Sequence, residues 1–533
     1  MAVAFACLIL YATVKWYCAR KAVNDLRKQG LPVAGWSWLV GSLSSFKEYM
    51  DRLPKGVSTK YAFAQMSLES NRGAIYADLW PFSMPVLVIN SPMMAAQIKE
   101  QVTESRRTPG VNEGIDGITG GPSLVTLPHK LWKPWRATFN PAFNPSYILD
   151  LTPQIVRCAE TFVEKLRTHA KAKALIQLEE DTLRLALDVI GLVTLNKEWD
   201  YQRKDAAIPR SLRKMIENTR LERKYQFLEK LNPLPRLHLA YHDRILRREI
   251  EKVLDECFSK RKQEQRTPRK GVKSIIACAL DCYMAENKAD EETLDPTFKQ
   301  QASTQLRLFM FAGHDTTSST IIYAYNLLSQ NPNCLTRLRA ELDAFLGPDV
   351  HAAGARLSSD PLITNQLPYT TACIKETLRL YPAASVVRLG SPDVVLTDED
   401  GTRYPTTNTV LYSLHFAIHR NPCAFPEPDV FNPERWLVGP EHPLHPPREA
   451  FRPFEHGAHN CIGQTLAMLE IKVVLAMTAR EFDIVPAYEE WDRLHPDGGR
   501  IKTAFGDRAF GVSDTAGGAH AAHKYPCRVT VRA

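Results

Sequence analysis

Cys461 lies in the segment FEHGAHNCIG, where glycines flank it and an apolar run typical of a helix follows directly. A cysteine just before a helix start has its thiolate favoured by backbone N–H groups and by the helix dipole. Gly457 and Gly463 carry no side chain, so the backbone can pass close to a flat, bulky group there. These features indicate a thiolate bound to a metal centre, with a buried cysteine in an ordinary turn as the alternative. Zinc is disfavoured, because His456 and His459 have no second Cys or His pair at zinc-finger spacing.

A second segment, AGHDTT at 312–317, lies within a long apolar stretch that is typical of a helix. Ala312 and Gly313 remove side-chain bulk from one helical turn. Glycine costs up to about 1 kcal/mol in a helix relative to alanine, so we interpret the pair as a groove for a ligand or cofactor. Asp315 and Thr316 place a carboxylate and a hydroxyl beside it, and such a pair can relay protons to a bound oxygen species. The alternative is close helix packing at the glycine, with the polar pair satisfied locally.

Glu376 and Arg379 lie three residues apart in KETLRL, on one face of an expected helix. Such pairs contribute only about 0.2–0.5 kcal/mol when they are exposed. Apolar neighbours flank this pair, and Arg435 in the downstream segment FNPERW is the candidate third partner of a buried network. These residues alone leave an exposed pair on a solvated face open as the alternative.

Composition limits the classes of protein open to the chain. Of its 533 residues 44% are hydrophobic and 24% are charged, which excludes global disorder and collagen. The net charge of +8 is mild for this length, so a histone-like polycation is excluded and no nucleic-acid partner is expected. The 11 cysteines show no paired framework, which indicates a reducing compartment.

The N-terminal segment MAVAFACLILYATV is uncharged and mostly apolar, and Lys15, Trp16 and Tyr17 follow it. It is shorter than the roughly 20 residues that span a bilayer, but a snorkelling lysine and interfacial aromatic rings suit a membrane boundary. We therefore expect a membrane anchor. A signal peptide and a buried core helix are the alternatives, although the basic region that usually precedes a signal peptide's apolar stretch is absent from this sequence. Basic residues after the apolar run favour a cytosolic catalytic body.

The expected organisation is an anchor with a basic flank at 1–29, a Pro/Gly hinge at 30–42 and one large catalytic domain at 43–533. Strand-like patterns lie at 72–90, 385–412 and the C-terminal CRVTV, and helical patterns lie at 150–265, 297–330 and 334–346. Helices dominate, so the expected fold class is mainly α with small β-sheets (α+β).

These motifs, in this order along the chain, resemble those of the cytochrome P-450 superfamily of heme-thiolate enzymes. The family's heme-binding loop, Phe-x-x-Gly-x-Arg-x-Cys-x-Gly, matches the segment from Phe454 to Gly463 except at one position. Its oxygen-activating helix matches AGHDTT, its Glu-x-x-Arg pair matches KETLRL, and its Pro-Glu-Arg-Phe-type segment matches PERW, with Trp436 in place of Phe. Its Trp-x-x-x-Arg pattern matches Trp132 and Arg136.

The resemblance covers residues 30–525 and departs from the family pattern inside the heme-binding loop. His459 stands where the family has an arginine that holds a heme propionate. A histidine can donate a hydrogen bond there but carries a full charge only when it is protonated. Propionate binding is therefore expected to rest more on Arg136, Trp132 and Arg388. The residues expected to bind the cofactor are Trp132, Arg136, Ala312, Gly313, Arg388, Phe454, Gly457, His459 and Gly463.

The resemblance implies that Cys461 is the proximal thiolate ligand of heme b iron and that dioxygen binds opposite it, near Ala312 and Gly313. Thiolate ligation favours O–O cleavage. Thr316 would stabilise the bound oxygen species and Asp315 would feed it protons through water. One oxygen atom would enter the substrate and the other would form water. The KETLRL glutamate and its arginine partners would hold the fold behind the heme, as structural residues.

Electrons are expected from another protein, because the sequence shows no flavin or nicotinamide fingerprint. The resemblance implies a membrane-bound, NADPH-dependent cytochrome P-450 reductase as donor and cytochrome b5 as a further partner, for a monomeric enzyme of the endoplasmic reticulum membrane. The Gly-rich GIDGITGG at 114–121 lacks dinucleotide spacing, and the resemblance places it in a loop over the substrate pocket. His129, Lys130 and Lys133 form a basic patch beside Trp132 that would meet an acidic partner, with a solvated helix face as the alternative.

The expected substrate is a small apolar molecule, since Ala383, Ala384 and Val386 would line an apolar cavity beside the heme. Parts of 108–124, 150–265, 305–316 and 383–389 would line the rest of it. The segments AGHDTTSST and HNCIG look most like fungal microsomal members, so fungal secondary metabolism is the expected setting. One alternative is a heme-thiolate isomerase, dehydratase or peroxygenase, which often lacks the acid–alcohol pair present here. The other is a non-catalytic heme-binding sensor, against which the relay motif and the anchor argue.

Overall fold

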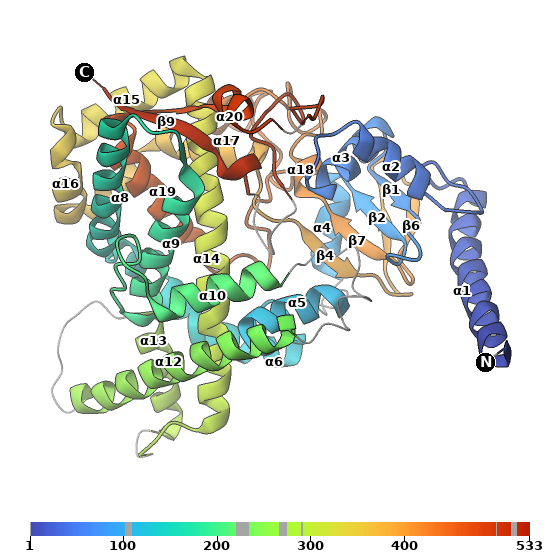
Figure 1. Ribbon diagram of the computed structural model, residues 1–533, viewed down its shortest axis with the longest axis horizontal. Helices are drawn as coiled ribbons and strands as arrows, with labels where there is room; N and C mark the ends of the chain where they lie inside the picture. The colour runs from blue at the N-terminus through green and yellow to red at the C-terminus, as the bar shows by residue number, and fades with distance from the viewer. Residues whose placement is uncertain are drawn as a thin grey trace.

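The computed structural model describes residues 2–101, 109–219, 234–265, 274–288, 292–496, 498–512 and 520–532. Figure 1 shows a large helical body crossed by the long helix α14 (Pro296–Gln330), and a smaller part that carries β-strands, from which helix α1 (Ala2–Lys28) projects. The expected class, mainly α with small sheets, is confirmed.

The other helices lie along the whole described chain. They are α2 (Leu43–Asp51), α3 (Thr59–Glu69), α4 (Pro92–Gln101), α5 (Pro109–Thr119), α6 (His129–Phe139), α7 (Pro145–Leu149), α8 (Thr152–Ala172), α9 (Leu178–Leu195), α10 (Ala207–Asn218), α12 (Leu234–Gln265), α13 (Ile275–Tyr283), α15 (Pro332–Leu346), α16 (Ala353–Ser359), α17 (Pro368–Leu380), α18 (His415–Ile418), α19 (Gln464–Thr478) and α20 (Tyr488–Leu494). The helices expected at 297–330 and 334–346 are thereby confirmed as α14 and α15.

The largest sheet joins strands that are far apart in the sequence. Its order is β1 (Ala74–Ala77), β2 (Val86–Ile89), β7 (Val410–Ser413) and β4 (Val386–Leu389), with β2 parallel to β7 and the other pairs antiparallel. Every residue of β1 and β2 is buried, because alternate side chains enter two different clusters. One face joins the main core and the other joins a smaller cluster that includes residues of α4. The strands expected within 72–90 and 385–412 are confirmed.

A second sheet ties the C-terminal segment to the start of α9. Its order is β3 (Ile176–Gln177), β9 (Pro526–Val531) and β8 (Phe482–Pro486), and both pairings are antiparallel. Because β3 leads directly into α9, this sheet places the first turn of α9 beside residues 520–525. The third sheet pairs β5 (Val395–Thr397) with β6 (Arg403–Pro405).

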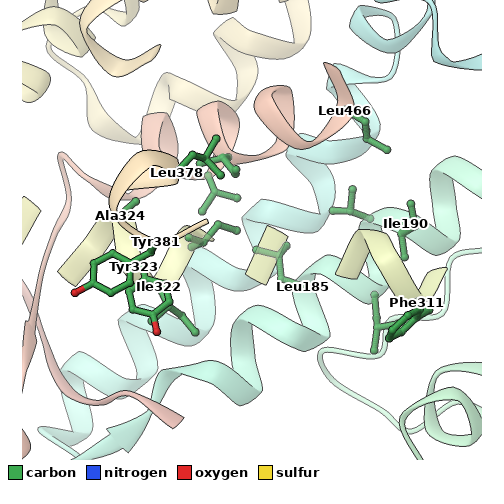
Figure 2. Close-up of a cluster of buried hydrophobic side chains, with 14 of the residues drawn as sticks. Leu185, Ile190, Phe311, Ile322, Tyr323, Ala324, Leu378, Tyr381 and Leu466 are labelled. Atoms are coloured by element: carbon green, nitrogen blue, oxygen red, sulfur yellow. The ribbon is translucent and has the colours of Figure 1, made fainter. Parts of the chain in front are cut away.

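Helix α14 is the central helix of the core. Residues 302–311 and 317–328 are all buried, whereas Ala312, Gly313 and Thr316 between them are partly accessible. Figure 2 shows Leu185 and Ile190 of α9 in one hydrophobic cluster with Phe311 and Ile322 of α14, and with Leu378 and Leu466 from α17 and α19. Each such side chain contributes roughly 1.5–3 kcal/mol relative to full exposure, so α14 is fixed over most of its length.

Gly313 serves the contact between α14 and α9. A Cβ atom at this position would lie 2.9 Å from Cδ1 of Ile190, which is closer than real Cβ contacts come. The Cβ direction of Gly313 thus fits the close-packing alternative, because a core residue of α9 fills that space. Gly313 itself is partly accessible, and its place in a ligand groove stays a prediction. Ala312 is the exposed small residue of this turn.

Helix α1 is longer than the apolar segment that begins it. The stretch Val3–Lys28 is long and apolar enough to cross a membrane, and little of it is buried in the protein. Its later part is docked, however, because Arg20 is fully buried with its Nη1 2.5 Å from Oδ1 of Asp78. Trp36 also donates to Asp78, at 2.9 Å. The basic flank of the expected anchor thus contains a residue that belongs to the core of the catalytic body.

The segment 30–42 is hydrogen-bonded to the sheet. The Ala34 N–H donates to the Tyr76 carbonyl oxygen at 2.8 Å, and the Tyr76 N–H donates to that of Pro32 at 2.9 Å. Gly41 has a φ of +62°, and a Cβ there would meet Arg20 and Asp78. The Pro/Gly segment therefore forms a turn packed on β1, and it fixes the course of the chain out of α1.

Candidate active site

The loop before α19 presents Cys461 at the start of the helix, as its sequence predicts. Gly463 is the N-cap of α19, and the N–H of Cys461 donates to the Phe454 carbonyl oxygen at 2.8 Å. Glu455 and Gly457 have φ angles of +57° and +82°, in the left-handed region, so the loop folds back on itself. This turn brings Phe454 and Cys461 together across the loop.

The Cys461 thiol is enclosed by protein and yet accessible. Burial raises the pKa of the thiol, while the Gly463 N–H and the Arg136 guanidinium oppose that rise. The side chain is nevertheless exposed. Both observations hold together if the sulfur faces a hollow inside the protein rather than packed side chains. Ala312 and Thr316 likewise interrupt the burial of α14.

The acid–alcohol pair lies on α14, and its two side chains have different partners. The Thr316 hydroxyl donates to the Ala312 carbonyl oxygen at 2.7 Å and stays partly accessible. Asp315 is buried, and its Oδ1 lies 2.9 Å from Nε2 of His520. Sequence reasoning missed His520, which lies some two hundred residues downstream of Asp315, because no local motif marks it.

Glu376 is the centre of a buried network. Its carboxylate accepts two hydrogen bonds from Arg379, at 2.8 and 2.9 Å, and lies 3.3 Å from Nε of Arg435. All three side chains are fully buried, so the exposed-pair alternative is wrong. Trp436, the departure from the family pattern, donates its indole N–H to Glu376 at 3.0 Å, and the backbone N–H of Asn432 donates at 2.9 Å. The tryptophan thus adds a hydrogen bond that phenylalanine could not make.

The residues expected to hold propionates gather around the loop. On α6, Trp132 is buried and lies against His459, with ring centroids 4.0 Å apart. Arg136 donates to the carbonyl oxygen and side-chain oxygen of Asn460, at 3.0 and 2.9 Å. Burial lowers the pKa of both Arg136 and Arg388. A cavity of about 100 Å³ is lined on this side by Ala95, Ile98, His129, Val386, Arg388, Ser413, Glu455, His456, Ala458 and His459.

Glu455 braces the same loop and was not anticipated from the sequence. It accepts from His415 at 3.0 Å and forms an ion pair with Arg452, which is fully buried. Burial opposes its ionisation, but His415 and Arg452 outweigh burial and lower the pKa of Glu455 to about 2, from an ordinary 4.5. A carboxyl group whose pKa is lower in the folded than in the unfolded protein stabilises the fold at pH values above its unfolded-state pKa. That stabilisation is lost as the pH falls through the folded-state pKa.

The Glu455→Gln variant is therefore expected to lower the free energy of unfolding by about 3 kcal/mol at neutral pH. The difference in unfolding free energy between variant and wild type should shrink as the pH falls from 4.5 towards 2, because Glu455 of the wild type then becomes protonated in the folded as well as in the unfolded protein. Chemical unfolding at several pH values measures it. Glu449→Gln is the control, because Glu449 also pairs with Arg452 but is partly exposed. A difference that stays constant with pH would contradict the assignment.

Three other features expected from the sequence lie in α5, in α6 and in the connection from α17 to β4. The Gly-rich stretch 114–121 was expected in a loop, but it is mostly helical as part of α5, which ends at Thr119. Lys130 and Lys133 are exposed on α6. Ala383, Ala384 and Val386 are at least partly accessible in the connection from α17 into β4, and Val386 lines the cavity that Arg388 shares.

Comparison with known proteins places this geometry in a family. The sequence model described as Cytochrome P450 matches residues 54–503. The chain belongs to the cytochrome P450 family. Cytochrome P450 monooxygenase polC of Polytolypa hystricis is 35% identical, over 99% of this chain and 95% of polC. Cytochrome P450 monooxygenase acrF of Aspergillus aculeatus is 32% identical, over 82% of this chain and 90% of acrF. The crystal structure of the cytochrome P450DA heme domain has the same fold, with a TM-score of 0.71 at 18% identity over 94% of this chain and 98% of that one.

This cytochrome P450 is therefore an oxidoreductase, a heme-dependent monooxygenase. Both named relatives are described as monooxygenases, and this chain matches them over 95% and 90% of their length. That description favours monooxygenation over the isomerase, dehydratase, peroxygenase and sensor alternatives. The cysteine thiolate is the family's axial ligand to heme, and the present chain offers one cysteine in the matching loop.

Proposed function

We propose that Cys461 is the thiolate ligand that would hold heme in this P450. The observation that carries the proposal is the accessibility of a thiol that protein otherwise encloses, beside a backbone N–H at a helix start. The residues present fit the group: the sulfur is a soft anionic donor, and the Gly463 N–H supports its negative charge. Ala312, the small accessible residue in the middle of α14, would leave room for the heme beside that helix.

Basic and hydrogen-bonding side chains at one edge of the loop would bind the two propionates. Arg388 is the arginine that lines the cavity there. It is buried, and its guanidinium donates to the neighbouring Val387 carbonyl oxygen at 3.0 Å. His459 would donate one hydrogen bond in place of the usual arginine, with Trp132 packed against its ring. Arg136 would contribute positive charge near Cys461, where its hydrogen bonds to Asn460 hold it against the loop. Phe454, Gly457 and Gly463 would shape the loop.

When bound, heme supplies the activation of dioxygen and the cleavage of its O–O bond. The Thr316 hydroxyl would donate a hydrogen bond into the cavity after leaving the Ala312 carbonyl oxygen. Asp315 would hold and release protons next to it. Glu376, Arg379 and Arg435 would keep the fold in place behind the site.

The membrane anchor, the electron donors and the substrate class complete the proposed function. The unit 1–29 would anchor the protein in the endoplasmic reticulum membrane, the packed turn at 30–42 would set its orientation, and the domain 43–533 would face the cytosol. Electrons would come from NADPH through a membrane-bound cytochrome P450 reductase, with cytochrome b5 as a second donor. The exposed Lys130 and Lys133 support docking of an acidic partner. The enzyme would act as a monomer on a small apolar substrate in fungal secondary metabolism.

A reconstituted assay tests the roles of the α14 pair. A screen of apolar compounds by the heme absorption spectrum first selects the compound that displaces water from the iron. The Thr316→Ala variant is expected to form roughly 100-fold less product from it per NADPH consumed, because proton delivery in the cavity is lost.

The matched control for this test is Thr320→Ala. Thr320 lies one turn further on and makes the same kind of bond, donating to the Thr316 carbonyl oxygen at 2.8 Å, but it is buried. Equal product per NADPH in the Thr316 variant and wild type would contradict the assignment of the pair.

A further inference from the structure

His520 is buried between two carboxylates that come from different parts of the fold. Its Nε2 lies 2.9 Å from Oδ1 of Asp315, and its Nδ1 lies 3.3 Å from Oε1 of Glu179. The three side chains are between 4% and 8% exposed. Buried carboxylates are costly unless a cation compensates them, so this arrangement calls for a charged His520.

The backbone fixes the place of His520 independently of the ion pairs. The His520 carbonyl oxygen accepts from the Val512 N–H at 2.9 Å, and the next residue, Ala521, pairs with Gly511 in an antiparallel bridge. On the other side, the Leu178 N–H donates to the Tyr525 carbonyl oxygen at 3.2 Å, just before Glu179. The C-terminal segment is thereby held against the start of α9 and against residues 511–512.

The electrostatics agree with a charged imidazole. Burial disfavours the protonated form, but Asp315 and Glu179 outweigh burial and raise the pKa of His520 well above its ordinary value. Glu179 belongs to the first turn of α9, and its contact is with the ring nitrogen opposite the one that faces Asp315. Glu179 thus supports the charge that His520 presents to Asp315.

We propose that His520 is a positioning residue, which holds the Asp315 carboxylate in one orientation beside Thr316 and so couples the C-terminal segment to the cavity. This inference rests on the roles proposed above for Asp315 and Thr316. A proton-transferring group works only in a defined orientation within hydrogen-bond reach of its target. Proton-transferring side chains depend on partner side chains that hold them in one rotamer. His520, the partner here, lies in no recognised sequence motif.

Carbon monoxide is the probe for the test, because its stretching band in the reduced enzyme reports the polar groups around the ligand without any substrate. Wild type is expected to give one narrow band. The His520→Gln variant, which keeps a similar volume but has no charge, is expected to broaden or split that band in the same way as Asp315→Asn. The double variant should add nothing further, since His520 acts through Asp315. His520→Arg restores a cation and should recover the single band at least in part.

Unfolding temperatures distinguish a loss of positioning from a general loss of folding. The shifts in unfolding temperature of His520→Gln and Asp315→Asn should be non-additive, as expected for groups in direct contact. His495→Gln, at the exposed C-cap of α20, is the control and should leave the band unchanged. With a substrate found by the screen, His520→Gln should lower product per NADPH about 10-fold at an unchanged KM, since a misplaced group costs rate more than binding.

The outcomes separate this inference from the proposed function. A wild-type protein without any thiolate-type carbon monoxide complex would overturn the proposed function. A band that changes in Asp315→Asn but stays as in wild type in His520→Gln would overturn the positioning role alone. The positioning role is overturned as well if His520→Gln only lowers the unfolding temperature and product per NADPH stays normal for the folded fraction.

Discussion

Replacing Glu376 by glutamine is expected to lower the free energy of unfolding by about 3–5 kcal/mol and to leave little recoverable heme protein. The change removes the charge that two fully buried guanidinium groups face, and it leaves Arg379 and Arg435 without compensation. A loss of this size is a large share of the roughly 5–15 kcal/mol that stabilises a typical fold. Thermal and chemical unfolding of the purified protein measure it.

Glu434, the residue just before Arg435 in the chain, provides the control. Glu434→Gln removes an ion pair with Arg337, but both of those side chains are substantially exposed. Its expected cost is about 0–1 kcal/mol. If the two variants lost similar stability, the network around Glu376 would not be the structural element described above.

The second large effect is expected at Cys461. The Cys461→Ala variant should lose incorporation of isotopically labelled dioxygen into product below the detection limit, because no other side chain at the loop supplies a thiolate. Cys423→Ala is the matched control, since Cys423 is also exposed but belongs to a different turn. Mass spectrometry of the product from reconstituted membranes measures the incorporation. Equal incorporation in Cys461→Ala and wild type would remove the cysteine from the mechanism.

The site could be predicted from the sequence where its residues are local and their spacing is fixed by one turn or helix. The Cys461 loop and the Glu376–Arg379 pair are of this kind, and the structure brings Arg435 to Glu376. Gly313 could not be interpreted fully from the sequence, because a small helical residue indicates close approach without showing which group approaches. Here the partner is Ile190 of α9, which only the tertiary packing reveals.

Long-range partners that belong to no recognised motif could not be predicted from the sequence. His520 reaches Asp315 because the β3–β9 pairing draws the C-terminal segment onto α9, and no periodic pattern encodes that pairing. Helix α1 shows the same limit. Its apolar start predicts an anchor, but the burial of Arg20 against Asp78 depends on a sheet that forms elsewhere in the chain.

The most direct test of the account is the carbon monoxide difference spectrum of the reduced, heme-loaded full chain. Wild type and Cys423→Ala are expected to show the thiolate-type absorption band, and Cys461→Ala is expected to lose it. A wild-type protein that binds heme without this band, or a Cys461→Ala protein that retains it, would contradict the claim that this sulfur holds the iron.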